Sequence, residues 1–192
     1  MNRYESFKQE QRTLVLVGKE LTKNRDQLKE FIDETSGFLS MEMIEDSDPL
    51  VVKKVDDKIV GICGVRRSEL INSLYLYVKK EFRGMGYGTE LVKMVIEQSK
   101  GKIDSIVLSV RMDNAPAIHI YKTCGFKRLY QFKLSGVKCW RMFIPLNRKG
   151  WFTPFKLVVI DLVYRLKCIK SLELLINYLT KYAKKYLLNM KG

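Results

Sequence analysis

The sequence predicts an α/β protein with a mixed, mostly antiparallel central sheet flanked by helices, followed by a C-terminal helical appendage. Three observations indicate this. Strand-like runs pair around turn residues near both ends of residues 1–146, and strand and helix patterns alternate between these pairs. Hairpins on either side of such an alternation predict a sheet of mixed direction. After residue 146 the pattern changes to long helical repeats rich in Lys and Arg, so we treat residues 1–146 as one domain and 147–192 as a basic, amphipathic helical appendage.

The first part of the chain predicts four strands and one helix. The helix is expected because Leu28, Phe31 and Ile32 recur at helical spacing. Two of the strand runs flank Asp56 and Asp57, which predicts a hairpin. All four strand runs are rich in apolar residues: 13–17, 50–55, 58–65 and 73–78.

The second part predicts two helices and three strands. A glycine-rich turn leads from the fourth strand into a helix that places Leu91, Val92 and Val95 on one face. A strand over 103–110 and a helix that ends before Gly125 come next. The last two strands flank a Ser-Gly turn and cover residues 127–134 and 139–146.

Composition narrows the class of protein. The chain has 192 residues, of which 46% are hydrophobic and 29% charged, an ordinary globular mixture. Four cysteines without a C-x-x-C pair, together with a single histidine, predict reduced thiols and no metal site. The longest run without a charged residue covers nine residues, 70–78, whereas a membrane-spanning helix needs about 18. We therefore expect a cytoplasmic protein.

Charge is distributed unevenly. The net charge is +14, which favours acidic partners such as a phosphorylated cofactor, nucleic acid or an anionic membrane. Residues 147–192 hold ten Lys or Arg and two acidic residues, a net charge of +8. Residues 30–52, in contrast, hold seven acidic residues and no basic one.

The glycine-rich turn is the most informative local motif. It joins a strand directly to a helix, and its three glycines allow the backbone to approach a ligand closely. Amides at a helix N-terminus favour an anion, and Arg83 adds a full positive charge. The spacing does not fit a dinucleotide fingerprint or a P-loop. A turn of this kind can bind a pyrophosphate, here through Arg83, Gly84, Met85, Gly86, Tyr87 and Gly88, and a glycine turn that only packs is the alternative that these residues leave open.

A second motif lies about thirty residues further on. Residues 114–126 match the pattern N-x-x-A-x-x-x-Y-x-x-x-G-F through Asn114, Ala117, Tyr121 and the pair Gly125-Phe126. Together with R-G-M-G-Y-G at residues 83–88, it closely resembles the GNAT superfamily of acyl-CoA-dependent N-acyltransferases, over about residues 12–146.

The resemblance implies roles for particular residues. The end of the fourth strand, at Tyr77 and Val78, would pair with the pantetheine arm, and Asn114 would lie near it where two parallel strands separate. Tyr121 would protonate the departing thiolate, which suits a hydroxyl with a pKa of about 10. The implied function is transfer of acetyl from acetyl-CoA to a primary amine by direct attack in a ternary complex, without a metal. The alternative is a non-catalytic module that binds acyl-CoA and uses its basic tail to contact a membrane, a protein or RNA.

The acceptor is expected to be a small molecule or a protein. In enzymes that the sequence resembles, the segment between the first strand and the first hairpin borders the acceptor groove. In this chain that segment is residues 33–49. An acidic surface there would attract a cationic amine, although a solvated acidic helix face is an equal alternative. The four carboxylates in question are Glu42, Glu45, Asp46 and Asp48. The fourth strand itself offers no carboxylate, so we expect a water chain to act as the base.

The appendage lies outside the resemblance. It predicts one helix over residues 155–170 and a clearer amphipathic helix over 171–190. We rank packing on the core or a homodimer interface first, and contact with the inner surface of a membrane second. Nucleic acid comes third.

Overall fold

The computed structural model describes residues 10–16 and 19–167. Its seven-stranded sheet has the order β1-β2-β3-β4-β5-β7-β6. All neighbouring strands are antiparallel except β4 and β5, which confirms the mixed, mostly antiparallel sheet. The strands are β1 (Gln11–Val15), β2 (Ser47–Val55), β3 (Lys58–Arg66), β4 (Ser73–Val78), β5 (Ser105–Arg111), β6 (Lys127–Leu134) and β7 (Val137–Pro145).

The long helices lie where the sequence predicts them, and two short ones were not predicted. The unpredicted helices α1 and α3 have five residues each, too few to show a helical repeat. The first strand begins two residues earlier than expected, at Gln11. The helices are α1 (Lys19–Lys23), α2 (Arg25–Asp33), α3 (Met41–Glu45), α4 (Tyr87–Ser99), α5 (Ala115–Thr123) and α6 (Thr153–Lys167), with short 3-10 turns η1 (Lys80–Phe82) and η2 (Lys149–Phe152).

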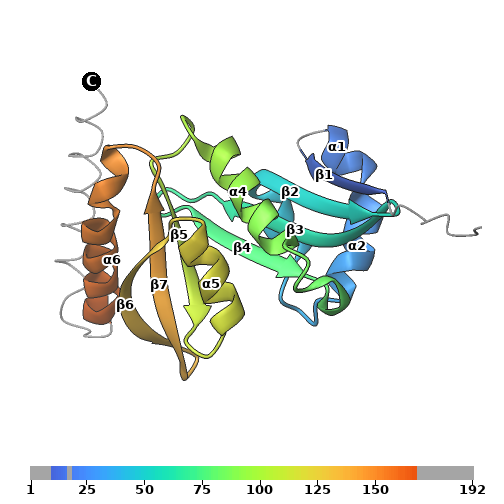
Figure 1. The fold of residues 1–192 in the computed structure, drawn as a ribbon. Coiled ribbons are helices and arrows are strands. Elements are labelled where there is room, and N and C mark those ends of the chain that lie inside the picture. Colours follow the sequence, from blue (N-terminus) through green and yellow to red (C-terminus); the bar gives the residue numbers. More distant parts are fainter. Residues whose placement is uncertain (1–9, 17–18, 168–192) are drawn as a thin grey trace, which may run out of the picture. The chain divides into compact units, whose positions relative to one another are not determined.

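Helices cover both faces of the sheet. Neighbouring residues of one strand point to opposite faces, so Val51 packs with α4 and α5 while Val52 packs with α2 and α3. The first cluster contains Leu91 of α4 and Tyr121 of α5. The second contains Phe31 of α2. Figure 1 shows α4 and α5 in front of the strands and α2 behind them.

The chain divides into two compact units, residues 1–151 and 152–192. The first unit contains the whole sheet. In the second, α6 is described, and the helix predicted over 171–190 lies outside the described residues. No described helix is long and apolar enough to cross a membrane.

Candidate active site

The sheet opens between its two parallel strands. Only one residue pair, Ser73 with Val107, joins β4 to β5, and the Val107 N–H donates to the carbonyl of Asn72 at 2.8 Å. Beyond this pair β4 runs on to Val78 without a further partner on β5. Backbone groups need hydrogen-bond partners, so this stretch of β4 is free to pair with an extended ligand. Both residues predicted to contact pantetheine, Tyr77 and Val78, lie in it.

The glycine-rich turn follows β4 after the short 3-10 turn η1 and forms an open loop at the N-terminus of α4. Gly84 and Gly86 have φ angles of +85° and +83°, which favour glycine, and a Cβ at either would meet nothing within 4 Å. These glycines therefore serve the backbone conformation and not packing. A helix of 13 residues starts at Tyr87, so its first amides and its dipole favour an anion here.

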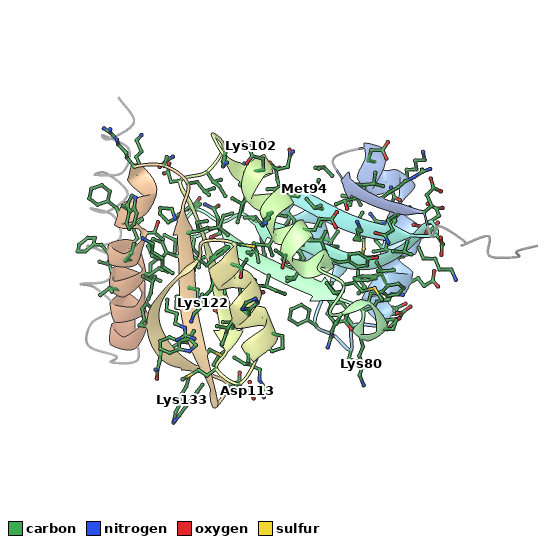
Figure 2. All side chains as sticks on the ribbon, viewed as in Figure 1. Lys80, Met94, Lys102, Asp113, Lys122 and Lys133 are labelled. Carbon is green, nitrogen blue, oxygen red and sulfur yellow. The ribbon has the colours of Figure 1, made fainter. Side chains whose placement is uncertain are left out.

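Arg83 links this loop to the end of β4. Its Nε donates to the carbonyl of Val78 at 3.0 Å, and its guanidinium lies 5.8 Å from the centre of the Tyr77 ring. Within the described residues its Nη groups make no ion pair, so they are available to a phosphate. Two further basic side chains, Lys80 on η1 and Lys122 on α5, are exposed (Figure 2).

Buried contacts hold the first turn of α4 in place. The Tyr87 ring is buried and stacks on Phe82, with 6.4 Å between the ring centres. The ammonium of Lys53 lies 4.9 Å from the centre of the Tyr87 ring. Lys53 donates to both carboxylate oxygens of Glu90 at 2.9 Å, and the hydroxyl of Thr13 donates to one of them. Burial raises the pKa of Glu90, but the bonds from Thr13 and Lys53 outweigh it and leave this pKa below its usual value. Met85, by contrast, is exposed at the tip of the loop.

Tyr121 is buried beside the opening. Its ring packs edge-on against Phe126 at 5.8 Å and shares a cluster with Leu74 of β4 and Leu108 of β5, the two strands that separate. Burial raises its pKa well above the ordinary value, and the thiols of Cys63 and Cys124 add to this. The hydroxyl therefore stays protonated, and it makes no hydrogen bond to the described residues.

One close approach relates α5 to α4, and one hydrogen bond caps the start of α5. A Cβ at Gly88 would lie 2.9 Å from Cδ1 of Ile120, so this glycine lets α4 and α5 approach closely. Asn114 caps α5: its Oδ1 accepts from the Ala117 N–H at 3.2 Å. That bond uses the single side-chain oxygen of Asn114. The side chain itself is exposed at the start of the helix.

The sequence model of the acetyltransferase (GNAT) family matches residues 16–126, more than half of the chain and both motifs. The chain belongs to this family. Among curated relatives, N-alpha-acetyltransferase 30 of Dictyostelium discoideum is 36% identical over 78 residues. That alignment covers 38% of this chain and 42% of the relative, less than half the relative's length.

Solved GNAT proteins share the fold. The Salmonella typhimurium protein yncA, solved with its cofactor acetyl-CoA, has a TM-score of 0.56 at 14% identity, and the alignment covers 72% of this chain and 95% of that one. Arabidopsis thaliana Naa50, in complex with the bisubstrate analogue CoA-Ac-MVNAL, also has a TM-score of 0.56 at 20% identity, covering 70% and 97%. The predicted family and fold are thus confirmed.

The acidic residues gather at the other end of β4. Arg66 pairs with Ser73, while Gly61 pairs with Val78. Arg66 therefore lies at the end of β4 that is remote from the glycine-rich turn. Five residues of strand separate these ends, a distance of about 16 Å. Here Asp46 lies 3.6 Å and Glu42 3.9 Å from the Arg66 guanidinium.

The other two carboxylates also have basic partners. Asp48 lies 3.0 Å from Arg67 and 3.8 Å from Lys102, and Glu45 pairs with Arg25. Each of the four carboxylates therefore has an arginine or lysine partner. Their predicted role toward a cationic acceptor stays a prediction.

A third buried tyrosine, which sequence reasoning did not single out, lies on the α2–α3 face. The Tyr75 hydroxyl is hydrogen-bonded to the hydroxyl of Ser47 at 2.9 Å, and burial raises its pKa. A Cβ at Gly64 would lie 2.5 Å from this hydroxyl, so only glycine fits beneath it. A glycine inside a strand marks such a close approach, and this signal was present in the sequence.

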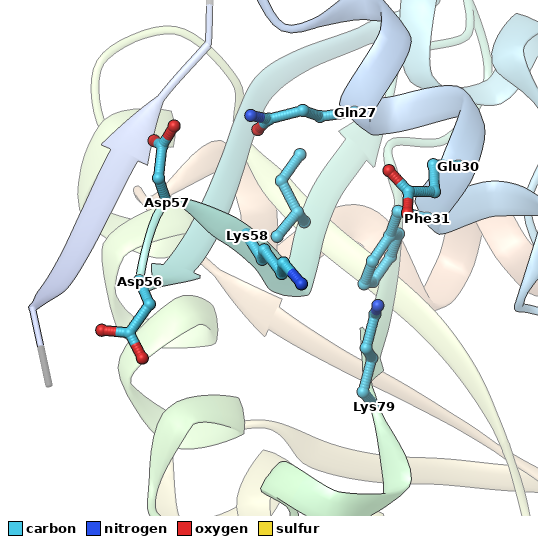
Figure 3. A pocket seen from close by; sticks show the side chains of 8 residues that line it. Gln27, Glu30, Phe31, Asp56, Asp57, Lys58 and Lys79 are labelled. Atoms are coloured by element: carbon cyan, nitrogen blue, oxygen red, sulfur yellow. The ribbon is translucent and has the colours of Figure 1, made fainter.

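A small cavity lies behind the end of β4 (Figure 3). Its volume is about 310 Å³. Phe31 and Ile59 give it apolar walls, and charged residues of both signs surround them. Lys79 stands at its edge, paired with Glu34 at 2.7 Å and lying 5.6 Å from the centre of the Phe31 ring. None of the predicted site residues lines it, so it is separate from the opening between β4 and β5.

Proposed function

We propose that the protein transfers an acetyl group from acetyl-CoA to a primary amine by direct attack in a ternary complex. One observation carries this proposal: β4 and β5 separate beside a buried, protonated Tyr121, and the open strand leads through η1 into a glycine loop at a helix N-terminus. Membership of the GNAT family supports the same activity.

The residues fit the coenzyme that this family implies. The loop amides, the α4 dipole and the free Nη groups of Arg83 suit a pyrophosphate. The unpaired edge of β4 at Tyr77 and Val78 suits the amide groups of a pantetheine arm. Acetyl-CoA supplies the activated thioester, and a β4 amide beside the opening would polarise its carbonyl. Asn114, at the start of α5, borders this region.

Tyr121 supplies the proton for the leaving thiolate. Its surroundings are apolar, so the neutral hydroxyl is the stable form throughout the neutral pH range, and the raised pKa makes it a weaker acid than the ordinary tyrosine expected from the sequence. A general acid in this position contributes about 10²- to 10⁴-fold to the rate. β4 carries no carboxylate between Ser73 and Val78, so we assign removal of the amine proton to ordered water.

We further propose that the acceptor is the α-amine of a polypeptide. The curated relative's name, N-alpha-acetyltransferase 30, and the peptide-linked analogue bound to Naa50 support this class. A polypeptide presents its terminal amine on an extended chain, which can reach a narrow opening between strands.

A transfer assay with matched acceptors tests both parts. One peptide has a free α-amine and no lysine, a second has a blocked α-amine and one lysine, and the third acceptor is a small polyamine. Transfer to the first alone supports the proposal. Transfer to the lysine peptide or the polyamine would overturn the acceptor class and leave acetyl transfer standing. Binding of acetyl-CoA without turnover on any acceptor would overturn the activity and favour a non-catalytic module.

A further inference from the structure

The outer side of α6 is apolar. Among residues 152–159 the exposed side chains include Phe155 at 71%, Phe152 at 66%, Val158 at 57% and Val159 at 40%. The buried ones in the same stretch are Thr153 and Leu157. A surface helix of a globular protein usually turns polar side chains outward, so this exposed apolar side requires an explanation.

The exposed residues form one continuous surface. Phe155 and Val158 are three residues apart and Phe155 and Val159 four, so they share one side of the helix. Phe152 comes from the turn that starts α6, and Trp151 just before it is also exposed, at 56%. We call Phe152, Phe155, Val158 and Val159 the outer face.

Positive charge accompanies the outer face. Residues 147–160 contain Arg148, Lys149 and Lys156 and no acidic residue. The exposed side chain of Lys156 stands among the apolar ones. Over residues 147–192 the net charge is +8. Aromatic and aliphatic side chains combined with cations are typical of a helix that lies in the interface of an anionic bilayer.

Charge also argues against two other occupants, a second copy of the chain and a nucleic acid. A second copy would bring two segments of charge +8 together in a symmetric contact, which is unfavourable. A nucleic acid would neutralise the lysines but would leave two phenylalanines and two valines in water. An anionic bilayer satisfies both properties at once.

We propose that the outer face of α6 docks on an anionic membrane surface. Phe152, Phe155 and Val158 enter the boundary between headgroups and acyl chains, while Lys156 of the same helix contacts the lipid phosphates. The helix lies along the surface. This interaction is independent of acetyl transfer and places the enzyme beside membrane-associated substrates.

Vesicle co-sedimentation of the full-length protein tests the apolar part. The vesicles are phosphatidylcholine alone or phosphatidylcholine with one third phosphatidylglycerol, at low salt. Binding is expected only to the anionic vesicles, and Phe152→Ser with Phe155→Ser should reduce the partition coefficient by about ten-fold or more. The control variant carries Leu134→Ser and Val137→Ser, which change exposed apolar residues at the β6–β7 turn, and it should bind within two-fold of wild type.

A second variant tests the charge. Replacing Arg148, Lys149 and Lys156 by Gln should weaken binding by up to about five-fold per residue at low salt and reduce the salt dependence, because the other basic residues of 147–192 remain. The circular-dichroism spectrum should match wild type in every variant, which separates lost contact from misfolding.

Three results would overturn the proposal. The first is no sedimentation with anionic vesicles at low salt. The second is binding that survives Phe152→Ser with Phe155→Ser unchanged. The third is a concentration-dependent dimer, or a complex with a mixed-sequence RNA, that the phenylalanine variant disrupts while vesicles are not bound.

Discussion

Two buried tyrosines lie on opposite faces of the sheet, and their hydroxyls differ. Tyr75 points to the α2–α3 face, where Ser47 pairs with it at 2.9 Å. Tyr121 packs on the α4–α5 face, and its hydroxyl has no hydrogen-bond partner in the described part of the chain. Burial raises the pKa of both. The two tyrosines are equally buried, but only the Tyr75 hydroxyl is hydrogen-bonded. We therefore give the Tyr75 hydroxyl a structural role, whereas the Tyr121 hydroxyl is left for a substrate.

The charged groups at the two ends of β4 differ in the same way. At the end near Ser73, Asp46 and Asp48 have arginine partners. At the other end, beyond Val78, the Nη groups of Arg83 make no ion pair to the described residues, and a Cβ at Gly84 or Gly86 would meet nothing within 4 Å. Polar groups in folded proteins are normally paired, so the unpaired set marks where a ligand is expected.

The largest expected effect separates the two tyrosines directly. Tyr121→Phe should lower kcat by about 10²- to 10⁴-fold, because it removes the proton donor and leaves the ring in place. The KM for acetyl-CoA should stay within two-fold. Tyr75→Phe removes a hydroxyl of equal burial and should leave kcat nearly unchanged. Steady-state kinetics of both variants measure this, and equal losses of kcat would remove the distinction.

The next effect should be the same for both tyrosines. Above pH 10 the unfolded chain releases tyrosine protons that the folded chain retains, because both folded pKa values are raised. The free energy of unfolding should then fall by about 1.4 kcal/mol per pH unit for each tyrosine. Urea unfolding between pH 9 and 11.5 should show a shallower decline in Tyr75→Phe and in Tyr121→Phe. An unchanged slope in either variant would mean that its tyrosine ionises as easily in the fold as in water.

Two glycines offer a matched pair for the loop. Gly86 and Gly37 have φ angles of +83° and +79°, and a Cβ at either meets nothing within 4 Å. Alanine at each should therefore cost about 1 kcal/mol of stability. Only Gly86→Ala should also raise the KM for acetyl-CoA, by about five-fold, because it disturbs the amides at the helix N-terminus. A comparable rise in Gly37→Ala would show that the effect is general destabilisation.

The smallest effect concerns the acidic residues. Neutralising Glu42, Asp46 and Asp48 should raise the acceptor KM by about two- to three-fold at low salt, and the increase should disappear at 0.5 M salt. The effect is small because Arg66 and Arg67 already offset these charges. The KM for acetyl-CoA serves as the internal control. An acceptor KM that does not move would assign the carboxylates to surface salt bridges alone.

The sequence was sufficient for features that are local in the chain. The glycine loop and the helix of Tyr121 follow from neighbouring residues, and the structure has them at the predicted positions. The five-residue helices α1 and α3 were missed because so short a helix has no readable repeat.

Features that depend on strand order could not be predicted. Thr13, Lys53 and Glu90 meet only because β1, β2 and α4 are neighbours. In the same way, the acidic segment contains no basic residue, and its partners Arg66 and Arg67 come from the end of β3. Sequence composition showed the charge of that segment but not its compensation.

The single residue pair that joins β4 to β5, Ser73 with Val107, also has a thermodynamic consequence. It leaves β1–β4 and β5–β7–β6 as two half-sheets with almost no ladder between them. A coenzyme lying in the opening would supply contacts that the strands do not make with each other, so it would bind the folded chain and not the unfolded one. At a concentration of 100 times its Kd, such a ligand adds about 2.7 kcal/mol to the free energy of unfolding. The concentration of acetyl-CoA would thereby affect the stability of the folded protein as well as the rate of the reaction.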